Sequence, residues 1–311
     1  MTRVYLDNAA TTPIGNYSAA EQESIMATAA NNLYLKGDWA GTVAAVGAYY
    51  DKATRPIYDK QMRFIRAQSL VNLNRPTEAV ADYNVILNDW TSAYTEKSLI
   101  SMSKLYMAQK RYNEAVVFLK RLETNSEYKA DYTFAINNLL LCYSEMEMPD
   151  DALHYVQLVR ENEKSSEEDK FKTGLYAGNA YLQKGDTDAA IKEFNYTVNN
   201  TKTVAAAEAK YHIAQIEYQK GNYKASQKTC FEITSKYGNY DYWLTKAYVL
   251  LADNYAALKD PFQAKATLQS VIENYKGDDD ILPDAKAKLQ KLNEASGATP
   301  AASAEPNKQD K

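Results

Sequence analysis

The sequence is poor in the residues that build most catalytic centres and cofactor sites. It holds 2 His, 2 Cys, 11 Gly and 8 Pro among 311 residues. So few glycines argue against a glycine-rich nucleotide-binding fold, and two distant cysteines, Cys142 and Cys230, argue against a disulfide framework. The two histidines, His154 and His212, also lie far apart, and neither has neighbours at the spacing of a metal-ligand set. We therefore expect no catalytic residue, no bound metal and no cofactor.

Charge and hydropathy argue against two further classes of protein. The 36 Lys and Arg are outnumbered by 40 Asp and Glu, and the net charge of −4 offers phosphate no long-range attraction, so we expect no nucleic-acid partner. No apolar run approaches the roughly 18 residues that a membrane span needs. Asp7 and Asn8 interrupt the first apolar residues, so no export signal is predicted, and at face value the chain is cytoplasmic.

What the sequence does have is an excess of tyrosine and a regular repeat. There are 26 Tyr against 7 Phe and 3 Trp, and seven segments read as helix, short polar turn, helix. A small residue follows the end of each turn by three positions. Two antiparallel helices approach to roughly 8 Å only where such small side chains face each other, so the pattern predicts tight helical hairpins. The members of this first column are Thr42, Ala79, Ala115, Ala152, Ala190, Ser226 and Ala264.

Two more columns keep the same register. A second, mostly small column lies twelve residues upstream, and a third column of larger residues lies four residues downstream of the first. Such hairpins cannot bury their faces alone, so we expect all seven to stack into one solenoid. The second column is Ala30, Ala67, Ser103, Leu140, Gly178, Ala214 and Ala252. The third column is Val46, Tyr83, Leu119, Val156, Phe194, Cys230 and Leu268.

The repeats define the expected domain organisation. Residues 17–294 form the solenoid, which ends in a capping helix from Pro283 to about Asn293. The charged stretch 161–170 is expected to loosen the middle of the stack. Residues 295–311 are small and polar and are predicted to be disordered, whereas residues 1–16 are predicted to be a foreign, poorly packed arm.

This pattern resembles the tetratricopeptide repeat family over about residues 23–294. The turns Gly37-Asp38-Trp39 and Gly221-Asn222-Tyr223 match the family best, while prolines replace the turn aromatic in three repeats. The resemblance implies an all-α fold, a tetratricopeptide α-solenoid of about seven antiparallel helix pairs with a C-terminal capping helix. It also implies a non-enzymatic scaffold that binds a protein or peptide partner.

The segment 262–272 is similar to the C-terminal end of long tetratricopeptide proteins of Bacteroidota-type bacteria. Those proteins are usually exported, so this resemblance implies that the chain is the C-terminal part of a longer protein of the periplasm or cell envelope. A structural spacer within a longer repeat array is the corresponding alternative to a scaffold. The sequence leaves the compartment and the oligomeric state open.

A different resemblance covers only residues 1–14. The segment Val4–Pro13 is similar to the opening of pyridoxal-phosphate-dependent cysteine desulfurases, which keeps that enzyme as an alternative function. The family's cofactor lysine directly follows a histidine, but His154 and His212 are followed by Tyr155 and Ile213. Both cysteines fall at expected helix-core positions instead of a mobile loop, so pyridoxal phosphate is not expected to bind.

The resemblance to tetratricopeptide repeats places the partner site on a concave surface lined by the first helix of each pair. Amides on this surface can pair with a peptide backbone, and Phe64 and Tyr211 can serve as anchors. Ala27 and Phe64 stand where the family's chaperone-binding members carry cations, so a chaperone tail is not the expected ligand. The alternative is that some of these positions only pack within the superhelix. The predicted partner-binding residues are Asn31, Tyr34, Phe64, Gln68, Lys104, Asn137, Asn179, Tyr211 and Gln215.

Overall fold

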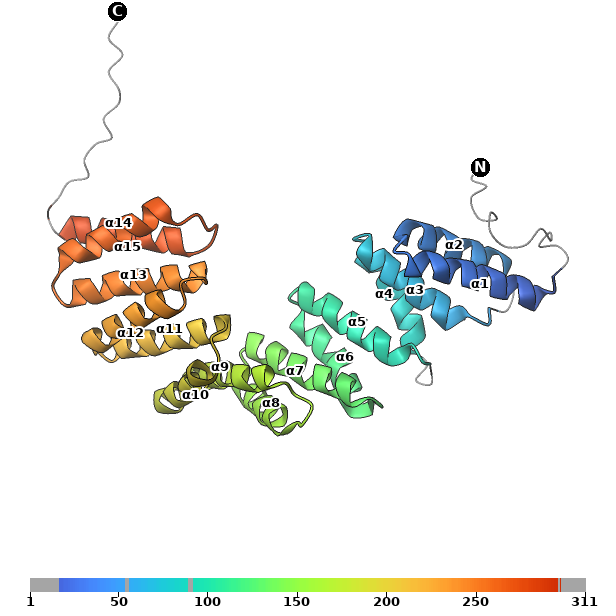
Figure 1. The fold of residues 1–311 in the computed structure, drawn as a ribbon, viewed down its shortest axis with the longest axis horizontal. Helices are drawn as coiled ribbons and strands as arrows, with labels where there is room; N and C mark the ends of the chain where they lie inside the picture. The colour runs from blue at the N-terminus through green and yellow to red at the C-terminus, as the bar shows by residue number, and fades with distance from the viewer. Residues whose placement is uncertain (1–16, 54–55, 89–91, 296, 298–311) are drawn as a thin grey trace, which may run out of the picture. The chain divides into compact units, whose positions relative to one another are not determined.

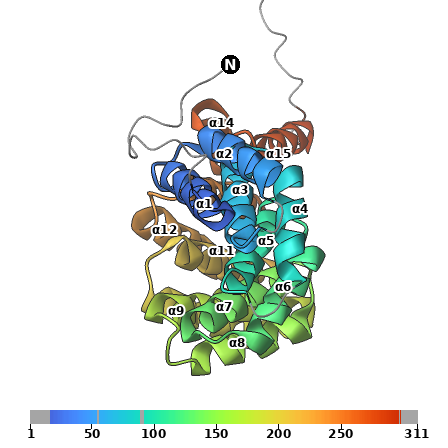
Figure 2. The same cartoon turned by 90° about the vertical axis from the view of Figure 1, so that its right-hand side faces the viewer.

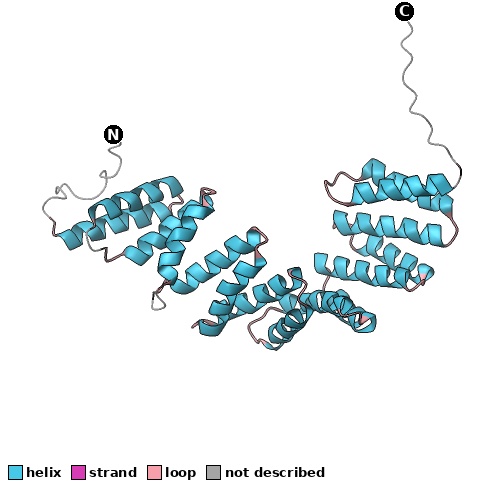
Figure 3. Cartoon of the chain, turned by 180° about the vertical axis from the view of Figure 1, so that it is seen from behind, coloured by secondary structure: helices cyan, strands magenta, loops and turns pink. Residues whose placement is uncertain are grey.

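The structure, a computed structural model, describes residues 17–53, 56–88, 92–295 and 297. Over these residues it consists of α-helices joined by turns and loops, without a strand (Figure 3). The prediction of an all-α fold is therefore confirmed. The predicted N-terminal arm, residues 1–16, and residues 298–311 of the predicted tail lie outside the described residues.

The helices belong to two compact units, residues 1–146 and 147–311, which we call unit 1 and unit 2. Unit 1 contains three helical hairpins, α1/α2, α3/α4 and α5/α6, followed by α7 (Figure 1). In Figure 2 the second helices α4 and α6 lie on one side of the unit, with α1, α3 and α5 beside them. The bounds are α1 Ala19–Leu35, α2 Trp39–Lys52, α3 Asp59–Asn72, α4 Pro76–Leu87, α5 Thr95–Ala108, α6 Tyr112–Asn125 and α7 Lys129–Glu145.

Unit 2 begins with α8, continues with the hairpins α9/α10, α11/α12 and α13/α14, and closes with α15 (Figure 1). The first helices contact one another in sequence, α9 with α11, α11 with α13 and α13 with α15. The predicted fourth pair, α7 and α8, is divided between the units, so the single continuous solenoid stays a prediction. The bounds are α8 Pro149–Glu161, α9 Glu167–Gln183, α10 Thr187–Asn200, α11 Val204–Gln219, α12 Tyr223–Lys236, α13 Asp241–Ala257, α14 Pro261–Asn274 and α15 Ile281–Ala295.

All three repeat columns are buried as predicted. Every member of the first column is at most 1% exposed, and every member of the third is at most 4% exposed. Gly178 of the second column shows why size matters there, because a Cβ on it would lie 2.3 Å from the ring of the fully buried Phe194. Nearby, a Cβ on Gly174 would lie 2.5 Å from the carbonyl oxygen of Glu193. These two glycines allow α9 and α10 to approach closely.

Each of the seven hairpin turns holds one residue in the left-handed backbone region. In the turns at Gly37, Asn74, Lys110, Gly185, Gly221 and Lys259, the residue that follows donates its N–H to a carbonyl five positions back, as in Arg111 N–H to Tyr106 O at 2.9 Å, which satisfies a carbonyl at the end of the first helix. Glycine is the residue that adopts this conformation without strain. The left-handed residues are Gly37, Asn74, Lys110, Glu147, Gly185, Gly221 and Lys259.

Two predicted details of the helices were wrong. The capping helix α15 begins at Ile281 instead of Pro283, because the Asp279 carboxylate accepts the Ile281 N–H at 3.0 Å and Pro283 fits within the first turn. The stretch 161–170 does not loosen unit 2. Ser166 caps α9 by accepting the Asp169 N–H at 3.1 Å, and the acidic residues that follow it favour the helix N-terminus, so α8 and α9 pack against each other.

Candidate functional site

The predicted site residues lie on the first helices, and we call the surface that these helices form within each unit the first-helix face. In unit 1 two of its amides are already engaged by neighbouring helices. The Gln61 amide of α3 donates to Asn31 Oδ1 of α1 at 3.3 Å, and the Gln68 amide of α3 donates to Ser101 Oγ of α5 at 2.7 Å. These two amides therefore hold adjacent first helices together, and a ligand would have to compete with those bonds.

The aromatic residues of this face in unit 1 are partly structural. The Phe64 ring packs 5.3 Å from Tyr94 and 6.4 Å from Tyr83, between centroids, and Tyr34 packs edge-on to Trp39 at 5.8 Å. Phe64 and Tyr34 are both half-buried, and burial raises the pKa of Tyr34. Both rings therefore pack in the core and also leave part of their surface accessible to a ligand.

Lys104 is the one charged residue among the predicted contacts. Its side chain is exposed on α5, and its Nζ lies 5.3 Å from the centroid of the Phe134 ring on α7. A cation over the face of an aromatic ring gains roughly 0.5–1 kcal/mol at an exposed site. The contact orients the lysine across two neighbouring first helices and leaves the charge accessible.

Three other predicted amides lack hydrogen bonds of the kind that Asn31 and Gln68 form with described residues. Within the described part of the chain, the side chains of Asn137, Asn179 and Gln215 form no hydrogen bond. Each residue is half-buried. In unit 2, Asn179 on α9 and Gln215 on α11 occupy the same repeat position on two helices that contact each other. The structure therefore places two uncommitted amides in one row.

Tyr211 is buried within unit 2, at 9% exposure. Its ring lies 5.4 Å from Trp243, and the Lys246 ammonium lies 5.8 Å from its centroid. Burial raises the pKa of the Tyr211 hydroxyl. The ring faces a small cavity of about 40 Å³ that α15 helps to close. Its role as an anchor stays a prediction, with only a small part of the ring available for contact.

Charged residues seal the end of this face against α15. Lys246 of α13 pairs with Asp280 at 3.3 Å, and Lys288 of α15 pairs with Asp253 of α13 and with Asp284 at 3.3 Å. Burial alone would lower the pKa of Lys288, but the bond to Asp253 and the nearby carboxylates raise it. The lysines in this cluster are therefore neutralised internally, unlike Lys104.

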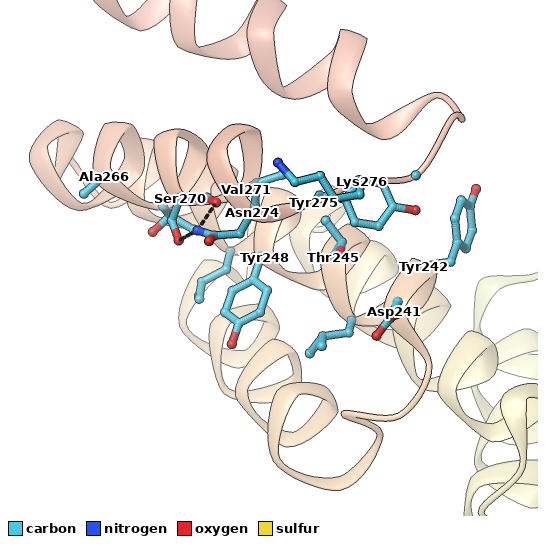
Figure 4. Close-up of a pocket in the computed structure, with 14 residues that line it drawn as sticks. Asp241, Tyr242, Thr245, Tyr248, Ala266, Ser270, Val271, Asn274, Tyr275 and Lys276 are labelled. Atoms are coloured by element: carbon cyan, nitrogen blue, oxygen red, sulfur yellow. Dashed lines mark hydrogen bonds between the residues drawn. The ribbon is translucent and has the colours of Figure 1, made fainter.

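A larger hollow lies elsewhere in unit 2, and the sequence analysis did not predict it. It has a volume of about 990 Å³ and is lined only by α13, α14 and the residues just after α14 (Figure 4). Leu251 and Val271 form its buried floor, while Tyr248 and Ser270 face it from the two helices. A comparison of equivalent positions between repeats could have indicated this hollow, because the preceding hairpin carries charged residues at the positions of Tyr248 and Ser270.

The described residues offer little for catalysis or metal binding. They contain no group of three or more His, Cys, Asp or Glu that could hold a metal ion. Cys142 and Cys230 are fully buried, as predicted, and burial raises the pKa of each thiol to about 12. Neither sulfur can act as an exposed nucleophile in this conformation.

Among the helices described, none combines the length and the apolar character needed to cross a bilayer.

Comparison with known proteins finds similarity at the levels of sequence and fold. The sequence model of the tetratricopeptide repeat matches residues 246–278, which include most of α13 and all of α14. No curated protein sequence matches the chain significantly. Among solved structures, a tetratricopeptide repeat protein from Parabacteroides merdae is 13% identical, with a TM-score of 0.54 over 88% of this chain and 99% of the other.

Two further structures share the fold. The apo form of the quorum sensor NprR from B. thuringiensis is 14% identical, with a TM-score of 0.62 over 91% of this chain and 84% of the other. Yeast Tom70 is 11% identical, with a TM-score of 0.52 over 89% of this chain and 56% of the other. Identities this low show the fold alone. With the buried repeat columns and the matched repeat in α13 and α14, they show that this chain is an all-α protein with the tetratricopeptide-repeat fold.

Proposed function

We propose that the chain is a non-enzymatic scaffold that holds an extended peptide segment of a protein partner on its first-helix face. The tetratricopeptide-repeat fold generally supports protein interaction and is typically non-enzymatic. Such a fold supplies a row of equivalent positions, one from each first helix, along which an extended ligand can be laid.

The uncommitted amides of Asn179 and Gln215 carry this proposal. Each offers both a donor and an acceptor, which is the pair that a peptide backbone presents at every residue. They occupy the same repeat position on neighbouring helices, so one extended segment can meet both. Half-buried amides without protein partners gain more from an incoming backbone than fully solvated ones.

The remaining predicted contacts take graded roles in this proposal. Within unit 1, Lys104 of α5 and Asn137 of α7 offer further polar contacts, and Lys104 favours an acidic group on the partner. Asn31 and Gln68 contribute less, because their amides already bond to Gln61 and Ser101. Phe64 and Tyr211 offer apolar edges beside the polar row.

The test is affinity capture from the native source with wild-type protein and the double variant Asn179→Ala/Gln215→Ala. A matched control, Asn195→Ala/Gln227→Ala, removes one Asn and one Gln side chain that are also half-buried but lie on the second helices α10 and α12. We expect the first variant to lose at least about 80% of a partner that the wild type and the control recover, because two backbone-binding amides are worth roughly 1–3 kcal/mol together. Equal recovery by all three proteins would remove these amides from the binding site.

A further inference from the structure

In the two preceding hairpins of unit 2, side chains meet at the positions where α13 and α14 leave the hollow between them. In the hairpin α11/α12, the equivalent of Tyr248 is Lys210 and the equivalent of Ser270 is Glu232, and these two form an ion pair at 2.9 Å. In the hairpin α9/α10, the equivalents are Gly174 and Tyr196, and a Cβ on Gly174 would lie 3.0 Å from the Tyr196 ring. In the last hairpin no such contact closes the gap, and the buried side chains of Leu251 and Val271 form its floor.

The same hairpin also exposes an aromatic side chain where the other repeats do not. Phe262, the second residue of α14, is 77% exposed. It lies four residues before Ala266 and eight before Ser270, so all three share one face of α14, and the last two line the hollow. The equivalent positions in the other six repeats hold Ala40, Thr77, Asn113, Asp150, Asp188 and Lys224.

We propose that this surface joins two copies of the chain. A two-fold interface requires one patch that is complementary to itself, with a protrusion and a recess on the same surface. Phe262 is the protrusion and the hollow is the recess, and both belong to α14. With the two α14 helices antiparallel and the axis beside Ala266, Phe262 of each copy meets Ser270 and the apolar floor of the other.

The small residues of α14 and the tyrosines beside the hollow favour a second copy as the occupant. The hollow of about 990 Å³ is open and large enough for a phenyl ring. Ala266 and Ser270 are small enough for two helices to approach closely between the protrusion and the recess. Tyr248 and Tyr275 flank the floor and can pack against an incoming ring (Figure 4). Phe262 of each copy is therefore buried in the hollow of the other copy, which gives two such contacts per dimer.

Sedimentation equilibrium of the full chain tests this proposal, over a concentration series from about 1 to about 200 µM, which brackets the affinity of modest interfaces. We expect reversible dimerisation of the wild type. Phe262→Ala should raise the dissociation constant at least about 100-fold, because the truncation removes a buried ring from both halves of the interface. Val117→Ala, which truncates another exposed apolar residue on the second helix α6, should leave it within about twofold of the wild type.

A second variant tests the recess independently of the protrusion. Tyr248→Lys/Ser270→Glu introduces the ion pair found in the preceding hairpin and should also prevent dimerisation. A monomeric wild type at the highest concentration would overturn the proposal and leave the hollow to a different partner. A dimer that survives both Phe262→Ala and the filled recess would overturn it too, because that dimer would use another surface.

Disulfide cross-linking tests the relative orientation of the two α14 helices in the proposed dimer. Ala266→Cys should form a covalent dimer under mild oxidation, because it lies beside the proposed axis, whereas Lys228→Cys, its equivalent on α12, should not. The native thiols of Cys142 and Cys230 are fully buried and do not compete. Equal cross-linking of the two variants would contradict the antiparallel arrangement of the α14 helices.

Discussion

Lys110 is the residue at which a glycine substitution should stabilise unit 1. Its φ is 57°, and its N–H and that of the next residue bond to carbonyls three and five positions back, as they do in the turn at Gly221, where φ is 78°. An L-residue in the left-handed region costs roughly 1–2 kcal/mol, while glycine costs about 0.5–1 kcal/mol more backbone entropy on folding. The difference predicts that Lys110→Gly raises the free energy of unfolding by about 0.5–1 kcal/mol.

Two matched variants isolate the backbone as the cause. Lys110→Ala removes the exposed lysine chain but keeps the Cβ, so it should change the free energy of unfolding by less than about 0.3 kcal/mol. Gly221→Ala should lower it by about 0.5–1 kcal/mol. A Cβ at Gly221 would meet nothing within 4 Å, so steric crowding cannot explain that loss.

Urea denaturation followed by far-ultraviolet circular dichroism measures all three variants. We expect the midpoint to rise for Lys110→Gly and to fall for Gly221→Ala, with unchanged slopes. If Lys110→Gly and Lys110→Ala raised the midpoint equally, the side chain would be the cause and the reasoning from backbone strain would be refuted.

Three further predictions concern close packing, buried charge and buried thiols. Gly178→Ala should cost about 1–3 kcal/mol because its Cβ would enter a buried ring, whereas Gly47→Ala, with open space around it, should be neutral or stabilising in the same urea assay. Asp82→Asn should cost about 2 kcal/mol in a thermal melt, since this buried carboxylate accepts hydrogen bonds from two arginines of α3. Cys142 and Cys230 should resist a thiol reagent at neutral pH until the chain is unfolded. Burial raises both pKa values from 9.0 to about 12, so their contribution to stability is present below pH 9 and is lost as the pH rises toward about 12.

The repeat columns were predictable because they follow from steric limits that act within one hairpin. Ala79 and Ala190 must be small where two helices cross, and both are fully buried. The left-handed residues at Lys110 and Lys259 were not predictable in this way. Their turns lack the glycine that usually marks the conformation, and only their alignment with Gly37, Gly185 and Gly221 points to it.

The helices that carry the predicted contact residues could be predicted from the sequence, but the hydrogen bonds of these residues could not. Repeat phasing placed Gln68 and Gln215 in one row, and both lie on first helices. The sequence could not show that Gln68 bonds to Ser101 while Gln215 bonds to no described residue, because such contacts depend on how neighbouring helices pack. The hollow between α13 and α14 was missed for a related reason, since it arises from side chains that fail to meet.

Site-directed photo-crosslinking in the native cell tests the proposed binding surface most directly. A photoreactive amino acid replaces Gln215 on the first-helix face in one experiment and Gln227 of α12 in another. We expect a discrete adduct with a protein partner from position 215 and none from position 227, and we expect Asn179→Ala to weaken the adduct. Adducts that form equally from both positions, or from Gln227 alone, would contradict partner binding on the first-helix face.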